Sequence, residues 1–315
     1  MRHAGELAVQ RRAGVRAGAW GSASATPEIP AVASDFLRRQ RMMLIGATGP
    51  DGRLWASALT GPMGFAEAVD ERTIVIEAVP GEHDPLAGLS GGEIGMLTIE
   101  PSTRRRMRIN GTVRREGGRL IVHTEQTYAN CPKYIQTRDV SAELAGPPAL
   151  VSTEGSFTAE HRAWIEGADT FFVATRAPGL GADLSHRGGN PGYVRMTGER
   201  RLVWPDYVGN SMYMTLGNLE LDESCGLLFL GWESGDTLQL TGRARVAWDP
   251  GDVPGAQRLV EFEVDRAVHI RGASPLRWTF EKYSRFNPPA RAAFPEAGAE
   301  AGGPATGADG DGEPR

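Results

Sequence analysis

The chain has 315 residues, of which 40% are hydrophobic and 23% charged, with a formal net charge of −5. This composition suits a globular protein of one or two domains, and the negative balance excludes a general attraction to nucleic acid. Two cysteines, Cys131 and Cys225, are too few for a disulfide framework and fit a reducing compartment.

The first 33 residues are expected to form a helical extension, with a helix at Glu6–Val15. Arginines and glycines interrupt the start of the chain, so it lacks the apolar core of a signal peptide. Arg11 and Arg12 form a twin-arginine pair, but no apolar segment follows them. No run anywhere approaches the roughly 18 apolar residues of a membrane span. The sequence therefore predicts a cytoplasmic protein without a membrane partner.

Residues 34–145 predict a first β-rich unit that opens with a helix at Ser34–Arg41, for which Ser34 is a suitable N-cap. Gly117 and Gly118 suit a tight hairpin, and a short helix is expected at His83–Leu89. Short runs of branched residues between Gly, Pro and Asp predict strands at Met42–Ala47, Thr73–Glu77, Ile94–Ile99, Arg105–Arg114 and Arg119–Glu125.

Residues 155–287 predict a second unit, which begins with a helix at Thr158–Gly167 and includes a helical turn within Ser211–Leu219. Residues 288–315 are mostly Ala, Gly, Pro and acidic residues, so they have little to bury and are expected to be a disordered tail. The strands predicted in this unit are Phe171–Thr175, Tyr193–Met196, Arg201–Trp204, Leu227–Gly231, Thr237–Trp248 and Arg258–Ile270.

The two units repeat each other. The first stretch, LWASALTGPMGFAEA, and the second, LSHRGGNPGYVRM, both place a serine before Gly-x-x-Gly and an aromatic residue, at a constant offset of 128 positions. Later matches, such as GMLTIE with GLLFLG, are offset by 131 positions. A fixed period indicates an internal duplication. The glycines are better explained by tight barrel corners than by a nucleotide motif.

These patterns predict a mainly β protein built from two barrels, since closure into a barrel removes exposed sheet edges. The stretches GNSMYMTLGNLELDESCGLLFLGWESGDTLQLTGRARV (209–246) and YANCPKYIQTR (128–138), with the order of the strands, resemble the pyridoxamine 5′-phosphate oxidase-like family of FMN-binding split barrels. The resemblance extends over about Glu6–Asp249. It is closest to the tandem two-barrel branch and much weaker to the vitamin B6 oxidase itself.

The resemblance implies that FMN lies in a cleft between the two barrels and that the second barrel provides most of the contacts. Ser185, His186 and Arg187 lie where the family places its first phosphate-binding arginine. The second phosphate segment of the family corresponds to PDYVGNSMYMT. Its usual basic pair is missing here, which leaves the exact phosphate ligands open. The residues expected to bind the cofactor in this second segment are Asp206, Asn210, Ser211 and Thr215.

The corresponding segment of the first unit contains Glu82, His83 and Asp84, which do not suit a phosphate. We therefore expect the site of the first unit to be degenerate. Arg104, Arg106 and Arg108 alternate along a predicted strand, so they are expected to share one face. That face is either solvated or neutralises a phosphate or an acidic substrate across the cleft, and Arg106 is included among the cofactor-binding candidates.

The stretch NCPKYIQ suggests a helix start, because Pro132 suits a first turn and Asn130 or Cys131 can cap it. Lys133 and Tyr134 then either pack on the barrel or line the flavin or substrate cleft. A reactive thiolate at Cys131 lacks an identifiable histidine partner. The six histidines show no metal-ligand spacing, so no metal site is predicted.

The resemblance implies an FMN-dependent oxidoreductase that takes electrons from a small-molecule substrate or a nicotinamide cofactor. The sequence identifies no catalytic acid or base. The alternative is a non-catalytic flavin or haem carrier, since related barrels also bind haem or a deazaflavin; a barrel that has lost cofactor binding and serves in assembly is a third interpretation. Whether the chain forms a homodimer stays open.

Overall fold

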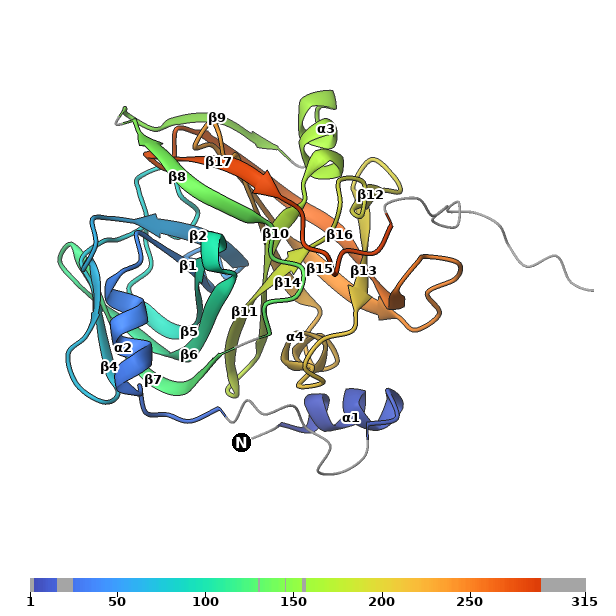
Figure 1. Cartoon of the computed structure of the whole chain (residues 1–315), viewed down its shortest axis with the longest axis horizontal. Helices are drawn as coiled ribbons and strands as arrows, with labels where there is room; N and C mark the ends of the chain where they lie inside the picture. The colour runs from blue at the N-terminus through green and yellow to red at the C-terminus, as the bar shows by residue number, and fades with distance from the viewer. Residues whose placement is uncertain (1–2, 16–24, 130, 145, 155–156, 290–315) are drawn as a thin grey trace, which may run out of the picture.

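The computed structural model describes residues 3–15, 25–129, 131–144, 146–154 and 157–289. Residues 290–315 of the predicted disordered tail lie outside the described residues. The structure is mainly β, and two antiparallel sheets form barrels that lie side by side (Figure 1). The structure confirms the predicted fold class of tandem split barrels.

The first barrel is one antiparallel sheet in which strands distant in sequence become neighbours. Its strand order is β2-β1-β5-β6-β7-β4-β3. The predicted hairpin is confirmed, because β6 and β7 are joined through Gly117 and Gly118 with Glu116 opposite Arg119. The strands are β1 (Met42–Thr48), β2 (Leu54–Thr60), β3 (Ala66–Ala68), β4 (Thr73–Ile76), β5 (Gly91–Glu100), β6 (Arg105–Glu116) and β7 (Arg119–Ala129).

The second barrel repeats this topology strand for strand, in the order β11-β10-β14-β15-β16-β13-β12, with β9 added beside β16. The registers also agree: Ile45 faces Ser57 in the first barrel, and Val173 faces Ser185 in the second. The strands are β9 (Ala149–Glu154), β10 (Thr170–Ala177), β11 (Gly181–Gly188), β12 (Arg195–Met196), β13 (Arg201–Tyr207), β14 (Ser224–Leu230), β15 (Thr237–Ala247) and β16 (Ala256–Arg271).

A two-stranded ribbon joins the ends of the two units. Strand β8 (Thr137–Glu143) follows the first barrel, and it pairs with β17 (Leu276–Lys282), which follows the second. The ribbon crosses the upper side of the molecule in Figure 1. The sequence did not predict this pairing, because its partners are more than 130 positions apart.

The helices cover the open ends of the barrels. Helices α1 (Ala4–Arg12), α3 (Ala159–Gly167) and α4 (Met214–Leu219) lie beside the second barrel, and α2 (Ala31–Arg38) beside the first. The predicted cap Ser34 is wrong: α2 begins after Pro30, and Ser34 lies within it. Every helix in the described part of the chain is too short to span a lipid bilayer.

Two predicted helices are absent from the structure. Residues 83–89 form successive turns, because the Asp84 carboxylate accepts a hydrogen bond from the Leu86 amide and holds the chain in a local turn. Lys133 and Tyr134 also lie in a turn rather than at a helix start, and Tyr134 has a positive φ of 64°. A left-handed residue cannot continue a right-handed helix.

Alternate side chains of the central strands belong to different cores, because successive residues of a strand point to opposite faces. Met43 and Ile45 pack inside the first barrel, whereas Met42 and Leu44 pack in the interface between the barrels. The interface core draws on both units: Leu54, Ala56, Leu97 and Ile99 meet Phe172, Ala174, Leu184 and Leu228. The two barrels therefore share a hydrophobic interface that buries both faces of their central strands.

Glycines allow the backbones to approach closely at this interface. A Cβ atom added at Gly95 would lie 2.5 Å from the backbone of Asp183, and one at Gly226 would lie 2.9 Å from the Leu54 carbonyl oxygen. These are equivalent positions of the repeat, so each barrel places a glycine, in β5 or β14, against the backbone of the other barrel. The contact also brings β11, with its predicted site residues, next to β5 and β6 of the first barrel.

Candidate functional site

One pocket at the junction of the barrels brings together all ten residues that the sequence suggested. It leaves about 110 Å³ for the centres of water-sized molecules, several times the roughly 10–15 Å³ that a single water needs. The predicted residues that line it are Arg106, Lys133, Tyr134, Ser185, His186, Arg187, Asp206, Asn210, Ser211 and Thr215.

The lining is strongly cationic. Arg106 and Arg108 come from β6 of the first barrel, and Arg187 from β11 of the second. Lys133 adds a fourth positive charge, and Asp206 is the one carboxylate among the described lining residues. A pocket with this balance favours an anionic ligand over a cationic one. Because both barrels supply charges, neither barrel alone could form the site.

Arg106 and His186 contact each other across the barrel junction. Arg106 Nη1 donates to His186 Nδ1 at 2.9 Å. A guanidinium can only donate, so the imidazole proton must reside on Nε2. Burial, and secondarily the charges of Arg106 and Arg187, lower the pKa of His186 well below its ordinary value. His186 is therefore a neutral imidazole of fixed tautomer at physiological pH.

Burial also acts on Arg106 itself. Burial, followed by repulsion from Arg108 and Arg187, lowers the pKa of Arg106 to about 9. The three guanidiniums raise each other's electrostatic free energy when nothing negative lies between them. An anion in the pocket would relieve this repulsion, which is the physical basis for a preformed anion site.

Asp206 lies between two arginines. Its carboxylate is 3.9 Å from Arg187 Nη2 and 3.7 Å from Arg258 Nε. Burial raises the pKa of Asp206, while these two arginines lower it. One carboxylate thus faces two guanidinium groups, so the three side chains together keep a net positive charge. The Asp206 carboxylate also holds Arg187 in position.

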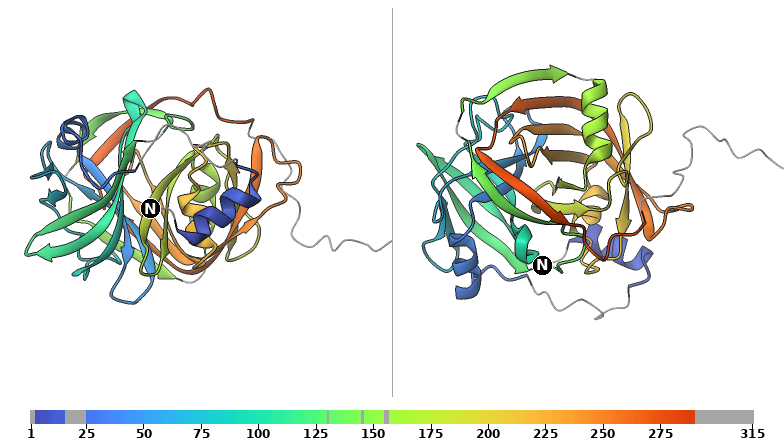
Figure 2. Two further views of the ribbon diagram at one scale, coloured as in Figure 1. Left: turned by 90° about the horizontal axis from the view of Figure 1, so that it is seen from below. Right: turned by 45° about the horizontal axis from the view of Figure 1, so that its top comes forward.

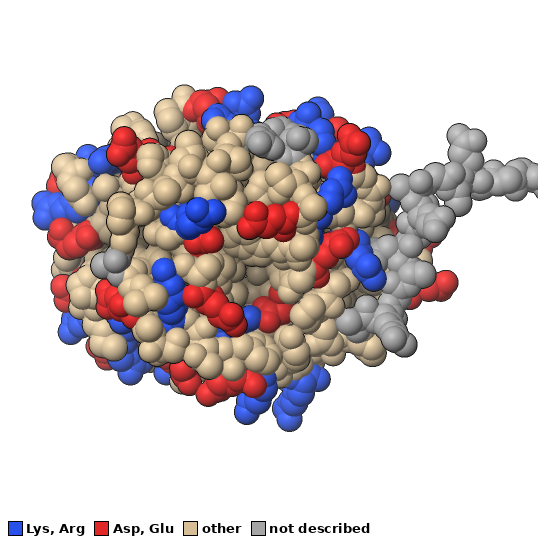
Figure 3. Space-filling model, turned by 90° about the horizontal axis from the view of Figure 1, so that it is seen from above, with Lys and Arg blue, Asp and Glu red and all other residues tan. Residues whose placement is uncertain are grey.

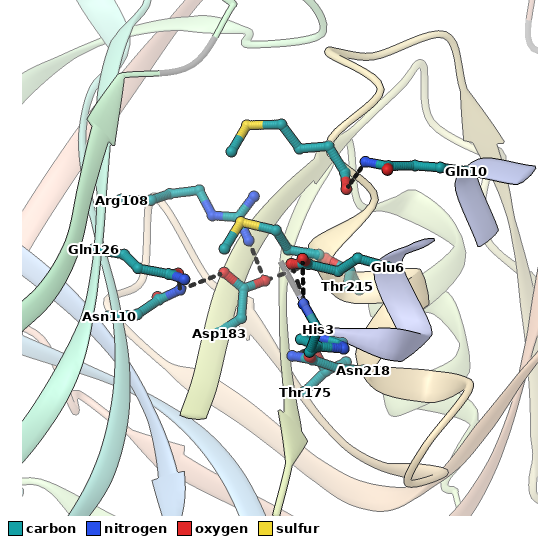
Figure 4. Close-up of polar contacts among 12 residues, drawn as sticks. His3, Glu6, Gln10, Arg108, Asn110, Gln126, Thr175, Asp183, Thr215 and Asn218 are labelled. Atoms are coloured by element: carbon teal, nitrogen blue, oxygen red, sulfur yellow. Dashed lines mark hydrogen bonds and ion pairs between the residues drawn. The ribbon is translucent and has the colours of Figure 1, made fainter. Parts of the chain in front are cut away.

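Arg108 is held differently, because it forms an ion pair with Asp183 (Figure 4). Asp183 also accepts hydrogen bonds from Tyr128 Oη at 3.2 Å, from Asn110 Nδ2 at 3.4 Å and from Thr215 Oγ1 at 3.4 Å. Both members of the pair are buried. The Asp183 carboxylate therefore acts as a hub that ties β6 and β7 of the first barrel to β11 and α4 of the second.

The loop that precedes α4 forms the outer wall of the pocket. Ser211 and Tyr213 both adopt positive φ, at 60° and 58°, a conformation that is costly for residues other than glycine. Helix α1 supports this loop, because Gln10 Nε2 donates to the carbonyl oxygens of Ser211 at 3.2 Å and Met212 at 3.1 Å. Figure 2 shows α1 (dark blue) beside α4 at one end of the second barrel, and Figure 4 shows Gln10 reaching from α1.

Aromatic rings also line the pocket. The rings of Tyr134 and Tyr207 lie 5.2 Å apart, and Tyr134 Oη donates to the Val208 carbonyl oxygen at 3.0 Å. Met212 and Met214 add polarisable side chains to the lining. A planar ring system can pack between such groups.

Several buried donors near the pocket have no hydrogen-bond partner among the described residues. They include Arg106 Nε, Arg187 Nε and the Nε and Nη1 atoms of Arg258. Buried polar groups are normally paired, and guanidinium N–H groups that lack an acceptor favour an anion nearby. The donors and the aromatic lining together fit a ligand with a phosphate and a flat ring, as FMN has.

Some details differ from the sequence-based expectation. Arg104 does not share the strand face with Arg106 and Arg108, because it precedes β6 in a left-handed conformation with φ of 55°. The sequence analysis missed Asp183, Gln10 and Arg258, which act on the site from positions without any local motif. Only the repeat offset pointed to this part of the fold, and these three residues are not part of the repeated motifs.

Within the described ranges, no cluster of three His, Cys, Asp or Glu side chains could hold a metal ion. On the face in Figure 3, acidic and basic side chains are interspersed rather than gathered into an area of one sign.

Residues 157–269 match the sequence model of the pyridoxamine 5′-phosphate oxidase family. No curated protein matches the chain. Among solved structures, HupZ of Group A Streptococcus is 11% identical, covering 38% of this chain and 98% of its own, with a TM-score of 0.30. MotI/DgrA, an inhibitor of motility from Bacillus subtilis, is 9% identical, covering 71% and 86%, with a TM-score of 0.24.

Likenesses this distant carry no functional argument, whereas the family match falls on the barrel that supplies most of the pocket. The match begins before α3 and ends within β16, so it includes Arg187, Asp206 and the loop before α4. The chain is thus a tandem split-barrel protein whose second barrel matches the sequence model of the pyridoxamine 5′-phosphate oxidase family.

Proposed function

We propose that the pocket binds FMN and that the protein is an FMN-dependent oxidoreductase. The observation that carries the proposal is the set of arginines from both barrels with unpaired buried donors, Arg106 and Arg187 foremost. A flavin phosphate provides the negative charge that this set lacks. Bound flavin would supply hydride or electron transfer, which no side chain supplies.

The chain's own residues would bind and orient the cofactor. Arg187 would hold the phosphate, with the amide of Asn210 and the hydroxyl of Ser211 beside it. Tyr134 and Tyr207 would pack against the ring and exclude water from one side. His186 would keep its proton on Nε2, so that it serves as a neutral donor rather than as a general acid.

Titration of the purified protein with FMN, followed by flavin fluorescence, tests the proposal. The variant Arg187→Ala should lose about 1.5–3 kcal/mol of binding free energy, which is typical of a hydrogen bond to a charged group. Arg245→Ala is the matched control, because Arg245 is an exposed arginine of β15 away from the pocket. Equal FMN affinity of Arg187→Ala and wild type would contradict the phosphate assignment.

The absorbance spectrum separates the alternatives. Flavin bands with consumption of a reduced nicotinamide support the oxidoreductase, and flavin bands without turnover support a carrier. A haem spectrum would overturn FMN as the ligand. His186 is the only histidine among the described lining residues, and its Nδ1 already accepts from Arg106, which argues against an axial ligand from this pocket.

A further inference from the structure

A second groove lies directly outside the flavin pocket. Its inner wall is the loop before α4, and it shares Gly209, Ser211 and Tyr213 with the pocket. The end of α1 provides one side, and Trp248 with the beginning of β16 provides the other. The two spaces therefore lie on either side of one short loop and have a wall in common.

The outer groove is cationic. Arg12 and Arg258 line it, and none of its described lining residues is acidic. Both guanidiniums lie over the Trp248 ring, at 4.3 Å and 5.1 Å from its centroid. These cation–π contacts help to orient both arginines. Asp206 of the inner pocket lies 3.7 Å from Arg258 Nε, and Arg187 shares this carboxylate.

Arg258 is a buried residue of the groove wall rather than an exposed surface residue. It is 3% exposed, and its Nη2 donates to Gln257 Oε1 at 2.9 Å and to Tyr213 Oη at 3.4 Å. Its Nη1 is buried without a hydrogen-bond partner in the described chain. An unpaired donor of a buried cation indicates room for an anionic acceptor.

We propose that the outer groove binds a second phosphoryl group, carried by a dinucleotide. This proposal rests on the proposed function, because the first phosphate is assigned to the inner pocket. The second group belongs either to a flavin ligand longer than FMN or to a nicotinamide dinucleotide that meets bound FMN. Both sources present the same phosphate chemistry to Arg12 and Arg258.

Two variants test the groove without touching the inner pocket. Arg12→Ala removes a charge, and Gln257→Glu adds an opposite one while keeping the acceptor for Arg258. Arg11→Ala is the control, because Arg11 belongs to the same helix but does not line the groove. In the first arm, FMN and FAD are titrated separately into each apoprotein. In the second, NADPH is titrated into the FMN-loaded protein.

The groove is supported if Arg12→Ala weakens FAD or NADPH about tenfold, as expected for one charge-assisted contact, while FMN affinity and Arg11→Ala stay at wild-type values. The arm that responds identifies the source of the phosphate. The groove proposal is overturned if FMN binds normally and neither variant changes either dinucleotide. Failure of FMN itself to bind would overturn the proposed function instead.

Discussion

The two barrels present equivalent surfaces to each other, yet their clefts have opposite character. The second cleft is the pocket described above, and the first cleft is its repeat-related counterpart around Ser57 and Gln239. The strand registers show which positions are equivalent: Arg187 corresponds to Leu59, Arg106 to Thr237 and Arg108 to Gln239. Every arginine of the second cleft thus has an uncharged counterpart in the first. The duplication preserved the backbone and changed the electrostatics.

The first cleft is occupied by its own chain. The Asp84 carboxylate accepts hydrogen bonds from Ser57 and from Gln239, at 3.1 Å for the latter, and these are the counterparts of Ser185 and Arg108. Leu86 and Leu89 of the same loop join the core of the first barrel. A fixed carboxylate therefore stands where the second cleft is proposed to hold a mobile anion, and one cofactor per chain is expected.

The largest effect is expected from Arg108→Gln, which installs the counterpart residue from the first cleft. It leaves the buried Asp183 without its cation, so the free energy of unfolding should fall by about 3–5 kcal/mol. Urea denaturation measures this loss. The double variant Arg108→Gln with Asp183→Asn should recover much of it, and failure to recover any would show that Asp183 is not the cause.

Arg106→Thr also installs a counterpart, but here the loss should appear in binding. We expect FMN affinity to fall by about 1.5–3 kcal/mol. The stability of the apoprotein should not fall in parallel, because the substitution relieves repulsion with Arg187. Flavin fluorescence and thermal unfolding measure the two quantities, and a parallel loss of both would mean that Arg106 is structural.

The same arginine predicts a pH dependence. A bound anion favours the charged form of Arg106. At pH values where Arg106 of the free protein has lost its proton, binding of the anion therefore requires uptake of a proton. Since that pKa is about 9, FMN affinity should decline as the pH rises through this value. Arg106→Thr should show a flatter profile in the same titration, and identical profiles would assign the titration to another group.

A smaller effect is expected from Gln10→Leu, because Gln10 supports the loop before α4 and does not line the pocket itself. Loss of the two hydrogen bonds to the loop carbonyls should cost about 1–2 kcal/mol of FMN affinity. Stopped-flow measurement should show this as faster dissociation. Leu7→Ala changes an exposed position of the same helix and should dissociate FMN at the wild-type rate; equal rates for Gln10→Leu would remove α1 from the site.

The smallest effect is expected from Asp84→Asn. Burial raises the pKa of Asp84 above its ordinary value, so the folded state holds this proton more tightly than the unfolded state does. The free energy of unfolding therefore falls as the pH rises from acidic to neutral and the carboxyl ionises. Removing the charge should change the unfolding free energy at neutral pH by less than about 1 kcal/mol and flatten its pH slope. FMN stoichiometry should stay at one per chain; a second bound FMN would show that Asp84 alone closes the first cleft.

The ten candidate residues could be assigned to one region because the repeat and the family motif both lie on strands and their flanking loops, where local sequence and position in the fold are linked. Asp183, Gln10 and Arg258 could not. Each acts through contacts with residues far away in the chain, such as Gln10 with Met212 and Asp183 with Arg108. The predicted helices at 83–89 and after Pro132 failed because side-chain contacts and a left-handed Tyr134 overrode local preference.

By itself, the sequence determined the period of the duplication, the alternation of strand faces and the change of composition after Pro288, since these depend on neighbours along the chain. Only the tertiary structure decided that β8 pairs with β17, and that arginines of two barrels converge on one pocket while the equivalent cleft closes on Asp84. The physical reason is that charge repulsion, burial and pairing depend on distances between atoms, and the fold alone brings those atoms together.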